Sequence, residues 1–288
     1  MLSRMRLPLV ASGVLVVAAL TACSPTASSP GSSASNTAAA GSCATGSLAT
    51  KTAGKLVIAT DSPAYDPWFS NDDPTNGKGY ESAVAYAVAK KMGFAANQVT
   101  WVKEGFNSSY APGRKPFDFD INEISITPDR AKVVDFSHGY YSTNQAIVTL
   151  TSQASKASSL AGLKSLKLGA QTGTTSLTAL RNDVAPTQQP LIFGTSDIAV
   201  RTLLNKQVDG IVVDLPTAFY LASSQSGLSV AGQFVPSGAQ EQFGLLLQKG
   251  SALTTCVNGA IDALKADGTL ASLQNTWLST TVKVPVLK

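Results

Sequence analysis

Strand and helix patterns alternate through the body of this 288-residue chain, and that alternation constrains its fold more than any other feature. Residues 55–60 are a short apolar run of β type, and residues 98–102 are another. Between them, residues 79–93 carry apolar side chains at helical spacing and end on a glycine. A strand, a helix and a strand in this order form a βαβ unit, which predicts a mostly parallel sheet flanked by helices.

A second series of the same kind follows the first. Its strands and helices are expected at residues 166–171, 175–181, 191–193, 195–205, 209–214 and 217–222. A strand at 242–247 and helices at 251–266 and 269–277 then complete the first series. We therefore expect an α/β fold with two lobes and two crossings, near residues 145–150 and 242–247. The first lobe would comprise residues 48–147 and 243–288, and the second lobe residues 148–242.

The first 22 residues have the form of a secretory signal. Arg4 and Arg6 precede an apolar run at 7–20, which is shorter than the roughly 20 residues of a membrane-spanning helix. Cys23 follows directly after small residues, as in the lipobox of bacterial lipoproteins, where this thiol receives a diacylglycerol and the mature protein carries fatty acids such as palmitate. We predict lipidation at Cys23 and a tether to the extracytoplasmic face of the cell membrane. The alternative is an ordinary signal peptide, or an N-terminal membrane helix, with an incidental cysteine.

The segment after Cys23 has a linker composition. Up to residue 47 it consists almost wholly of Ser, Ala, Thr, Gly and Pro and carries no charge. Such a segment cannot bury enough apolar surface to offset the entropy lost on ordering. Residues 23–47 are therefore predicted to be a lipidated cysteine followed by a disordered linker.

The charge balance argues against a nucleic-acid partner. The chain has 22 basic and 18 acidic residues, and removing Arg4 and Arg6 with the signal leaves 20 basic against 18 acidic ones. No dense Lys/Arg cluster is present, although nucleic-acid binding requires one. At 44% apolar and 14% charged residues, the chain has the composition of a globular protein.

Two cysteines remain besides Cys23. In an oxidising compartment Cys43 and Cys256 are expected to pair, and the alternative is two free thiols with Cys256 buried in a helix. The only histidine is His138, and no Cys/His spacing fits a zinc site. We predict no metal, no cofactor and no role in catalysis for His138.

A set of short motifs, in order and at characteristic spacing, makes the body of the chain resemble a known family. These motifs are GKLVIATD at 54–61, GYE at 79–81, SITPDRA at 125–131, VDFS at 134–137, YY at 140–141, QTGTT at 171–175, VVDLP at 212–216 and LKADGT at 264–269. Together they resemble the extracellular solute-binding proteins of ABC importers for polar amino acids. The resemblance covers residues 54–278. It implies a periplasmic-binding-protein-like (type II) clamp whose two hinged lobes close on a small ligand and are then presented to a membrane permease. It also implies a non-catalytic protein, which we expect to be a monomer.

The same resemblance assigns both charged ends of an amino-acid ligand. Arg130 would bind the carboxylate, helped by the hydroxyl and N–H of Ser125, because a guanidinium grips a carboxylate with two parallel bonds. Asp214, at the end of an apolar strand, would bind the ammonium group. The alternatives are a surface ion pair of Arg130 with Asp129 or Glu123, and a helix-capping role for Asp214.

Five further residues are expected at the ligand. Thr174 and Thr175 would offer hydroxyls and amides, although either could simply cap the helix that follows. Asp61, Tyr65 and Trp68 would line the pocket for the ligand side chain, although Trp68 could instead belong to the core or the cleft rim.

Glu123 departs from the family pattern, because many relatives carry small residues such as glycine at this place. It could select a cationic side chain together with Asp61, form a salt bridge with Arg130, or lie at the hinge. A different class of function also stays open. Some relatives with this fold are dehydratases acting on cyclic acids and others are sensor lobes of receptors, and an enzyme would need a positioned acid such as Glu123.

Overall fold

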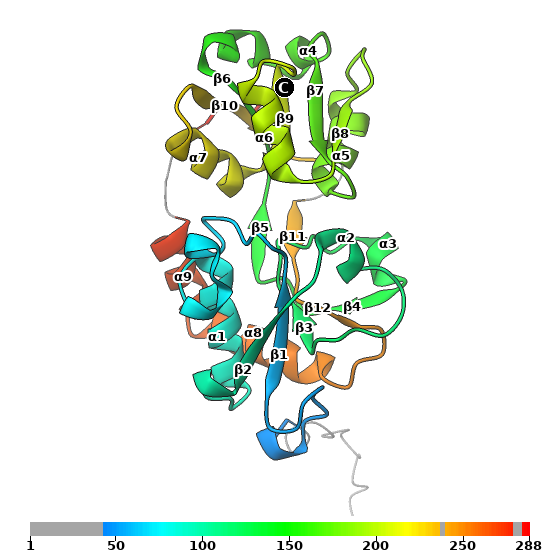
Figure 1. The fold of residues 1–288 in the computed structure, drawn as a ribbon, viewed down its shortest axis with the longest axis vertical. Helices are drawn as coiled ribbons and strands as arrows, with labels where there is room; N and C mark the ends of the chain where they lie inside the picture. Colours follow the sequence, from blue (N-terminus) through cyan, green and yellow to red (C-terminus); the bar gives the residue numbers. More distant parts are fainter. Residues whose placement is uncertain (1–42, 237–239, 279–283) are drawn as a thin grey trace, which may run out of the picture. The chain divides into compact units, whose positions relative to one another are not determined.

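The computed structural model describes residues 43–236, 240–278 and 284–288, in which two five-stranded sheets flanked by helices form two lobes (Figure 1). The predicted two-lobed α/β fold is confirmed. Cys23, the signal and the linker up to residue 42 lie outside the described residues. Within the described part, no helix is both long and apolar enough to cross a membrane.

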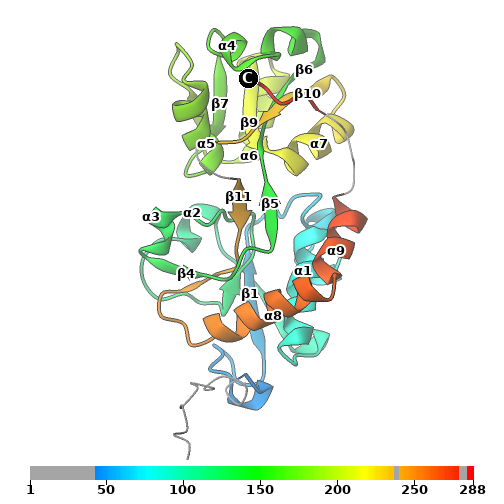
Figure 2. The same ribbon diagram turned by 180° about the vertical axis from the view of Figure 1, so that it is seen from behind.

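The sheet of the first lobe has the strand order β2-β1-β3-β12-β4. Its strands are β1 (Leu56–Thr60), β2 (Val99–Lys103), β3 (Phe119–Asp120), β4 (Val134–Phe136) and β12 (Leu246–Gln248). Its helices are α1 (Tyr80–Lys91), α2 (Phe106–Ser109), α3 (Pro128–Ala131), α8 (Thr254–Ala266) and α9 (Thr269–Trp277). Helices α1, α8 and α9 pack together on one side of this lobe in both views (Figures 1 and 2). They bury a core that includes Leu56, Tyr80 and Ile261.

The sheet of the second lobe has the strand order β10-β6-β9-β7-β8. Its strands are β6 (Gln145–Leu150), β7 (Leu168–Gln171), β8 (Leu191–Phe193), β9 (Gly210–Asp214) and β10 (Leu228–Phe234). Its helices are α4 (Leu160–Leu163), α5 (Thr175–Ala179), α6 (Ser196–Leu204) and α7 (Leu215–Ser224). Apolar clusters lie around both Ile147 and Val148, neighbours in β6 whose side chains point to opposite faces of the sheet.

Both sheets are mixed rather than mostly parallel. In the first lobe β1 runs parallel to β2 and β3, whereas β12 runs antiparallel to β3 and β4. In the second lobe β7 runs parallel to β8 and β9, whereas β6 runs antiparallel to β9 and β10. The strands that follow the crossings, β6 and β12, are the antiparallel ones, because the chain enters each sheet against the direction of the βαβ units.

A two-stranded ribbon joins the lobes. It consists of β5 (Tyr141–Thr143) paired antiparallel with β11 (Glu241–Phe243), between the two sheets in Figure 1. The crossings were expected slightly later in the chain. The first expected crossing, β6, already belongs to the second sheet, and the second divides into β11 and β12 around Gly244. A Cβ atom at Gly244 would lie 2.8 Å from the Ile126 side chain, so a larger residue here would force that side chain to move.

The C-terminal residues differ from the expected lobe boundary. Residues 284–288 were expected in the first lobe, but they lie on β10 of the second lobe. The N–H of Leu287 donates to the Gln233 carbonyl over 2.8 Å, and the N–H of Gln233 donates to the Pro285 carbonyl over 2.9 Å. The Leu287 side chain is 4% exposed within the apolar cluster of the second lobe. Its burial supplies the physical reason for this location, since a leucine gains about 1.5–3 kcal/mol when removed from water.

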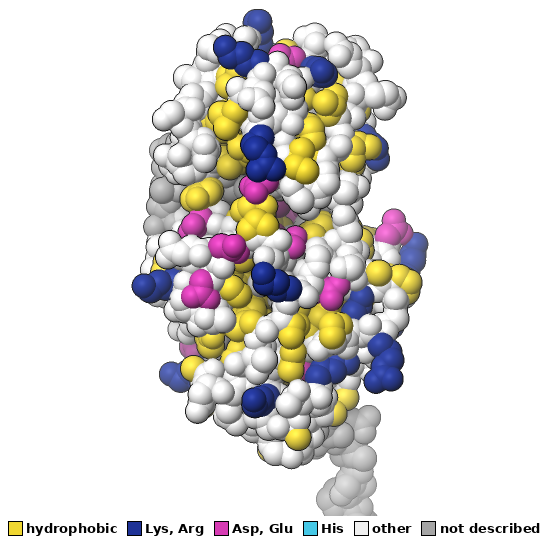
Figure 3. All heavy atoms as spheres, in the orientation of Figure 1, with side chains coloured by type: hydrophobic (Ala, Val, Ile, Leu, Met, Phe, Trp, Pro, Cys, Tyr) yellow, Lys and Arg dark blue, Asp and Glu magenta, His cyan; other side chains and the backbone are white. Residues whose placement is uncertain are grey.

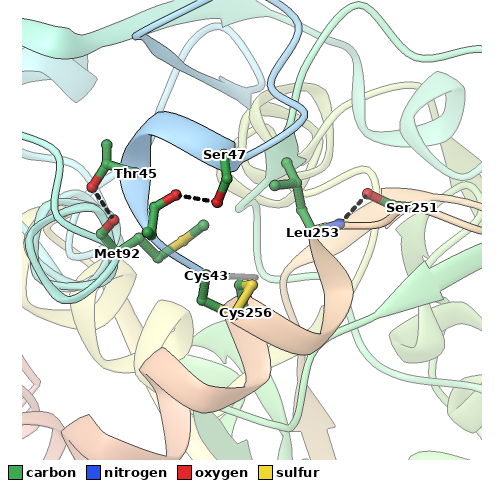
Figure 4. Close-up of a disulfide and its surroundings, with 8 residues drawn as sticks. Cys43, Thr45, Ser47, Met92, Ser251, Leu253 and Cys256 are labelled. Atoms are coloured by element: carbon green, nitrogen blue, oxygen red, sulfur yellow. Dashed lines mark hydrogen bonds between the residues drawn. A yellow bond between two sulfur atoms is a disulfide. The ribbon is translucent and has the colours of Figure 1, made fainter. Parts of the chain in front are cut away.

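A disulfide joins Cys43 to Cys256 in α8, as predicted, and links positions 213 residues apart (Figure 4). The expected linker therefore ends earlier than residue 47. Next to the bridge, a 3₁₀ turn at Thr45–Ser47 lies against the first lobe, where the Thr45 hydroxyl donates to the Met92 carbonyl over 3.1 Å. The start of the folded body is thus fixed to α8 of the first lobe.

Candidate functional site

A cavity of about 70 Å³ lies between the lobes and is lined by residues from both. Six of the nine predicted ligand residues line it, namely Asp61, Tyr65, Glu123, Thr174, Thr175 and Asp214. Several of them follow β1, β7 or β9, whose carboxyl ends face the same gap, as expected for ligand sites of α/β sheets. In the space-filling view, several acidic side chains lie across the middle of the face, where the lobes meet (Figure 3).

Arg130 lies beside this cavity and is 8% exposed. In its short helix α3, Thr127 is the cap that accepts from the Arg130 N–H over 3.2 Å, and a proline is the first helical residue. The guanidinium donates to the Ser125 carbonyl over 2.7 Å and, across the gap, to the Gly173 carbonyl of the second lobe over 2.9 Å. It therefore lies between the lobes and not at the surface.

Two aromatic rings cover the guanidinium of Arg130. Its central carbon lies 4.6 Å from the ring centre of Tyr110 and 5.4 Å from that of Phe106. The alternative ion pair with Asp129 does not form, because Asp129 instead contacts Lys132 over 2.6 Å at the surface. Arg130 keeps further N–H donors beyond the two that contact carbonyls, since a guanidinium has five.

Ser125 connects the region of Arg130 to the hinge ribbon. Its hydroxyl donates to Glu241 Oε2 over 2.8 Å and lies 3.3 Å from the hydroxyl of Thr175 in the second lobe. Ser125 is buried and does not line the cavity wall. A ligand carboxylate at Arg130 would therefore compete with Glu241 for this hydroxyl.

Asp214 ends β9 and precedes α7, but it does not cap that helix through its side chain. Its Oδ1 accepts from Gln145 Nε2 over 2.8 Å, and the same Gln145 amide donates to Glu241 Oε1 over 3.0 Å. Removal from bulk water, together with the Glu241 charge, raises the pKa of Asp214 well above its usual value. A cation placed beside Asp214 would reverse this shift by stabilising the carboxylate.

The two threonines have different roles. Thr174 caps α5, because its hydroxyl accepts from the Leu177 N–H over 3.0 Å, and it donates to the Gln171 carbonyl over 2.8 Å. Its hydroxyl is therefore engaged within the lobe, as in the capping alternative. Thr175 has no capping bond and leaves its hydroxyl facing Ser125.

Asp61 and Tyr65 line the cavity, whereas Trp68 does not. Burial raises the pKa of Asp61, whose Oδ1 accepts from the Ser62 N–H over 2.6 Å. Burial and the charge of Asp197 raise the pKa of Tyr65 to about 12. Trp68 is fully buried in the core of the first lobe, and only its indole N–H reaches out, donating to the Thr217 hydroxyl of the second lobe over 2.9 Å.

Glu123 has an unusual backbone conformation. Its φ of 51° is in the left-handed region that favours glycine, so the chain turns at Glu123, shortly after β3 ends at Asp120. Glu123 Oε2 accepts from the Thr217 hydroxyl over 3.0 Å, and no ion pair with Arg130 forms. Withdrawal from bulk water and the charges of Glu81 and Asp214 raise the pKa of Glu123 well above its usual value.

Several residues of this region were not predicted from the sequence. They are Phe106, Tyr110, Thr217 and Glu241, and the buried acids Glu81 and Asp120. A signal for Glu81 was available, because it is an acid in the first turn of α1 that shares the buried side of this helix. With Asp61, Glu123 and Asp214, these acids bring six carboxyl groups into the region, so it favours a cation.

The unfolding free energy of the ligand-free protein is expected to fall as the pH rises from about 4.5 to about 7. Burial raises the pKa of Glu81 from 4.5 to about 7, so the folded state holds this proton more tightly than the unfolded chain does. This contribution is fully present below pH 4.5 and is lost as the pH passes through about 7, with a slope of at most about 1.4 kcal/mol per pH unit. Urea titrations between pH 4.5 and 7.5 measure it. Glu81→Gln should flatten the slope, whereas Asp129→Asn, at an exposed acid, should leave it unchanged; an equal slope in Glu81→Gln would contradict the assignment.

No group of three or more His, Cys, Asp or Glu residues that could hold a metal ion occurs within residues 43–236, 240–278 and 284–288. His138 lies at the surface, where Nδ1 contacts Asp262 over 2.8 Å. The chemical groups at the cavity include carboxyls, hydroxyls, side-chain amides and aromatic rings, with one guanidinium nearby.

Two lobes with a polar cavity at their junction define a solute-binding protein of the clamp class. Residues 56–280 match the family model described as bacterial extracellular solute-binding proteins, family 3, and the chain belongs to this family. The resemblance stated from the sequence is confirmed.

Individual relatives are similar at moderate identity. One is the ABC transporter arginine-binding protein 1 of Escherichia coli K12, with 28% identity over 75% of this chain and 88% of the relative. Another is the L-cystine-binding protein TcyJ of the same strain, with 28% identity over 81% of this chain and 85% of the relative. Among solved structures, an amino acid ABC transporter substrate-binding protein from Streptococcus pneumoniae bound to L-arginine has a TM-score of 0.66 and 26% identity, over 78% of this chain and 94% of the other.

Proposed function

We propose that this protein binds an amino acid outside the cytoplasm and delivers it to the permease of an ABC importer. The observation that carries the proposal is the position of Arg130 between the lobes, covered by two aromatic rings, with Asp214 across the cavity region. A guanidinium and an opposing carboxyl group match the two charged ends of a free amino acid. The relatives that bind arginine or cystine by name support the same class of ligand.

The binding step needs only modest rearrangement of the site. The ligand carboxylate would take free N–H donors of Arg130 and the hydroxyls of Ser125 and Thr175, displacing the bond from Ser125 to Glu241. The ligand ammonium would take Asp214. Bonds between the lobes, such as Arg130 to Gly173, already link the two halves, and a ligand that contacts both lobes would shift the population toward the closed form.

The ligand we propose carries a second positive charge on its side chain. The acids Asp61, Glu123 and Asp214 line the cavity, and no basic residue of the described part of the chain does. Carboxyl groups removed from water stay protonated when no cation is near. A cationic ligand side chain would allow one of these groups to ionise and to form a charge-assisted hydrogen bond with it. Tyr65 and Phe106, which also line the cavity, would pack against the apolar stem of such a side chain.

The partners follow from this assignment. We propose that Cys23 carries a lipid that anchors the protein to the outer face of the cell membrane, and that the protein acts as a monomer whose two lobes contact the permease together. The described chain begins at Cys43, which the disulfide fixes to the first lobe. The length of chain between Cys23 and Cys43 would therefore set how far the lobes can lie from the membrane.

A thermal-shift screen of the free amino acids tests the proposal. We expect L-arginine or L-lysine to raise the melting temperature most, L-glutamine to raise it less, and L-glutamate to have no effect because its side chain adds a charge to an acidic cavity. The bound compound should be recovered unchanged after incubation. No shift with any amino acid would contradict the proposed function, and recovery of a converted product would favour an enzyme on this fold.

A further inference from the structure

Glu81 is a fully buried acid that the proposed binding step does not use. It lies in the first turn of α1 and is 0% exposed. One of its oxygens, Oε1, accepts from the hydroxyl of Tyr140 and from the N–H of Glu123, the latter over 2.7 Å. The other oxygen, Oε2, has no hydrogen-bond partner among the described residues. A buried carboxyl group with one oxygen lacking a hydrogen bond lowers the stability of the fold, so we expect Glu81 to have a role that offsets this loss.

The bond from Glu123 to Glu81 fixes the backbone at the turn where β3 ends. A residue other than glycine resists a φ of 51°, so the turn needs support from its surroundings. Glu81 supplies that support, because its carboxyl group accepts a hydrogen bond from the backbone N–H of Glu123. The Tyr140 hydroxyl in turn holds the Glu81 carboxyl group, and the Tyr80 hydroxyl donates to the Tyr140 carbonyl over 3.0 Å.

The turn directs the Glu123 side chain across the gap between the lobes. Its carboxyl group accepts from Thr217 of the second lobe, and Thr217 accepts from the Trp68 indole of the first lobe over 2.9 Å. The Trp68 and Tyr80 rings pack edge to face with centres 6.0 Å apart. Glu123 is thus held at both ends, by Glu81 through its backbone and by Thr217 through its carboxyl group.

We infer that Glu81 is a positioning residue, which fixes the turn that places the Glu123 carboxyl group in the cleft, where this group selects a ligand with a second cationic group. The inference rests on the proposed function, because it concerns the preference among amino acids. It goes further in assigning that preference to a residue in the core that contacts no ligand. Glycine at position 123 would leave Glu81 with no side chain to position.

The test compares the affinities for L-arginine and L-glutamine by titration calorimetry and uses their ratio as the arginine preference. Glu81→Met keeps the volume but removes the acceptor, and we expect it to lower the arginine preference about 10-fold, a change of about 1.4 kcal/mol. Glu81→Gln keeps an acceptor oxygen for the Glu123 N–H and should hold the preference within about 2-fold. In a Glu123→Gly background, Glu81→Met should change the preference no further.

Asp118 offers a matched control. It is a buried acid of the same lobe whose carboxyl group accepts two backbone N–H groups, from Lys51 and Val57, each over 2.7 Å, away from the cavity. Asp118→Leu should lower the melting temperature and leave the arginine preference unchanged. If Glu81→Met does not fold, Tyr140→Phe, which frees the Glu81 carboxyl group on one side, should lower the preference by about 2- to 10-fold.

The outcomes separate the two proposals. A wild-type protein that binds neither probe would overturn the proposed function and the preference that depends on it. A wild-type protein that binds both, with an unchanged preference in Glu81→Met (or in Tyr140→Phe where the first variant does not fold), would overturn the positioning role alone. An equal loss of preference in the Glu123→Gly background would also overturn it, because the effect would then not pass through Glu123.

Discussion

Replacing Arg130 with alanine is expected to reduce amino-acid affinity at least about 30-fold. The guanidinium is the only basic group that the described chain places between the lobes at the proposed carboxylate position, and it is withdrawn from water beneath the Tyr110 ring. Removing one partner of such a pair costs about 2–5 kcal/mol, which corresponds to 30- to several-thousand-fold in affinity. Titration calorimetry with L-arginine measures the loss.

Stability must be measured alongside affinity, because Arg130 also donates to the carbonyls of Ser125 and Gly173. Leaving these acceptors without a partner should cost about 1–3 kcal/mol of unfolding free energy. Arg130→Lys keeps the charge but loses the planar fork, so it should bind more weakly than wild type and more tightly than Arg130→Ala. Arg114→Ala, at an exposed arginine of the same lobe, should match wild type in both measurements. Wild-type affinity in a folded Arg130→Ala protein would rule out the carboxylate role.

Removing the disulfide is expected to lower the unfolding free energy by about 2–5 kcal/mol. The bridge closes a loop of more than two hundred residues, and by the chain-entropy model a longer loop removes more freedom from the unfolded chain. It also attaches the Thr45–Ser47 turn to the first lobe. The double variant Cys43→Ala, Cys256→Ala should unfold at lower urea concentration than wild type.

The control for the disulfide uses the wild-type protein with a reductant. Reduction should bring the unfolding midpoint of the wild type close to that of the double variant and should leave the variant unchanged. Neither cysteine lines the cavity, so the affinity for L-arginine should be the same in both proteins at a temperature where both are folded. A wild-type midpoint that does not respond to a reductant able to open the bridge would contradict the stabilising role.

The fold was predictable where apolar runs are continuous. The strands β1 and β9 have nearly every residue buried, and their sequences showed this directly. By contrast, β10 was not predicted, because its sequence LSVAGQF mixes small and polar residues and resembles a loop. Its pairing with β6 depends on contacts far apart in the chain. The burial of Leu287 was hidden for the same reason, since nothing near it in the sequence indicates the second lobe.

The site was predictable where residues follow a strand. Asp61 and Asp214 come directly after β1 and at the end of β9, so their place at the cavity followed from the topology. Glu123 was singled out because an acid stands where glycine is common, and its left-handed φ gives that departure a structural meaning. Phe106 and Thr217 were missed, because each reaches the cavity only through the packing of a helix. Trp68 was expected in the pocket or, as the alternative, in the core, and its ring lies in the core.

The two ends of the described chain belong to different lobes. Cys43 is bonded to α8 of the first lobe, whereas Leu287 packs into the second, where the C-terminal end lies in both ribbon views (Figures 1 and 2). Two fluorophores, one introduced close to each end of the described chain, would therefore report on different lobes. Energy transfer between such dyes would report on the separation of the lobes directly, with no label near the cleft to disturb capture of the cargo.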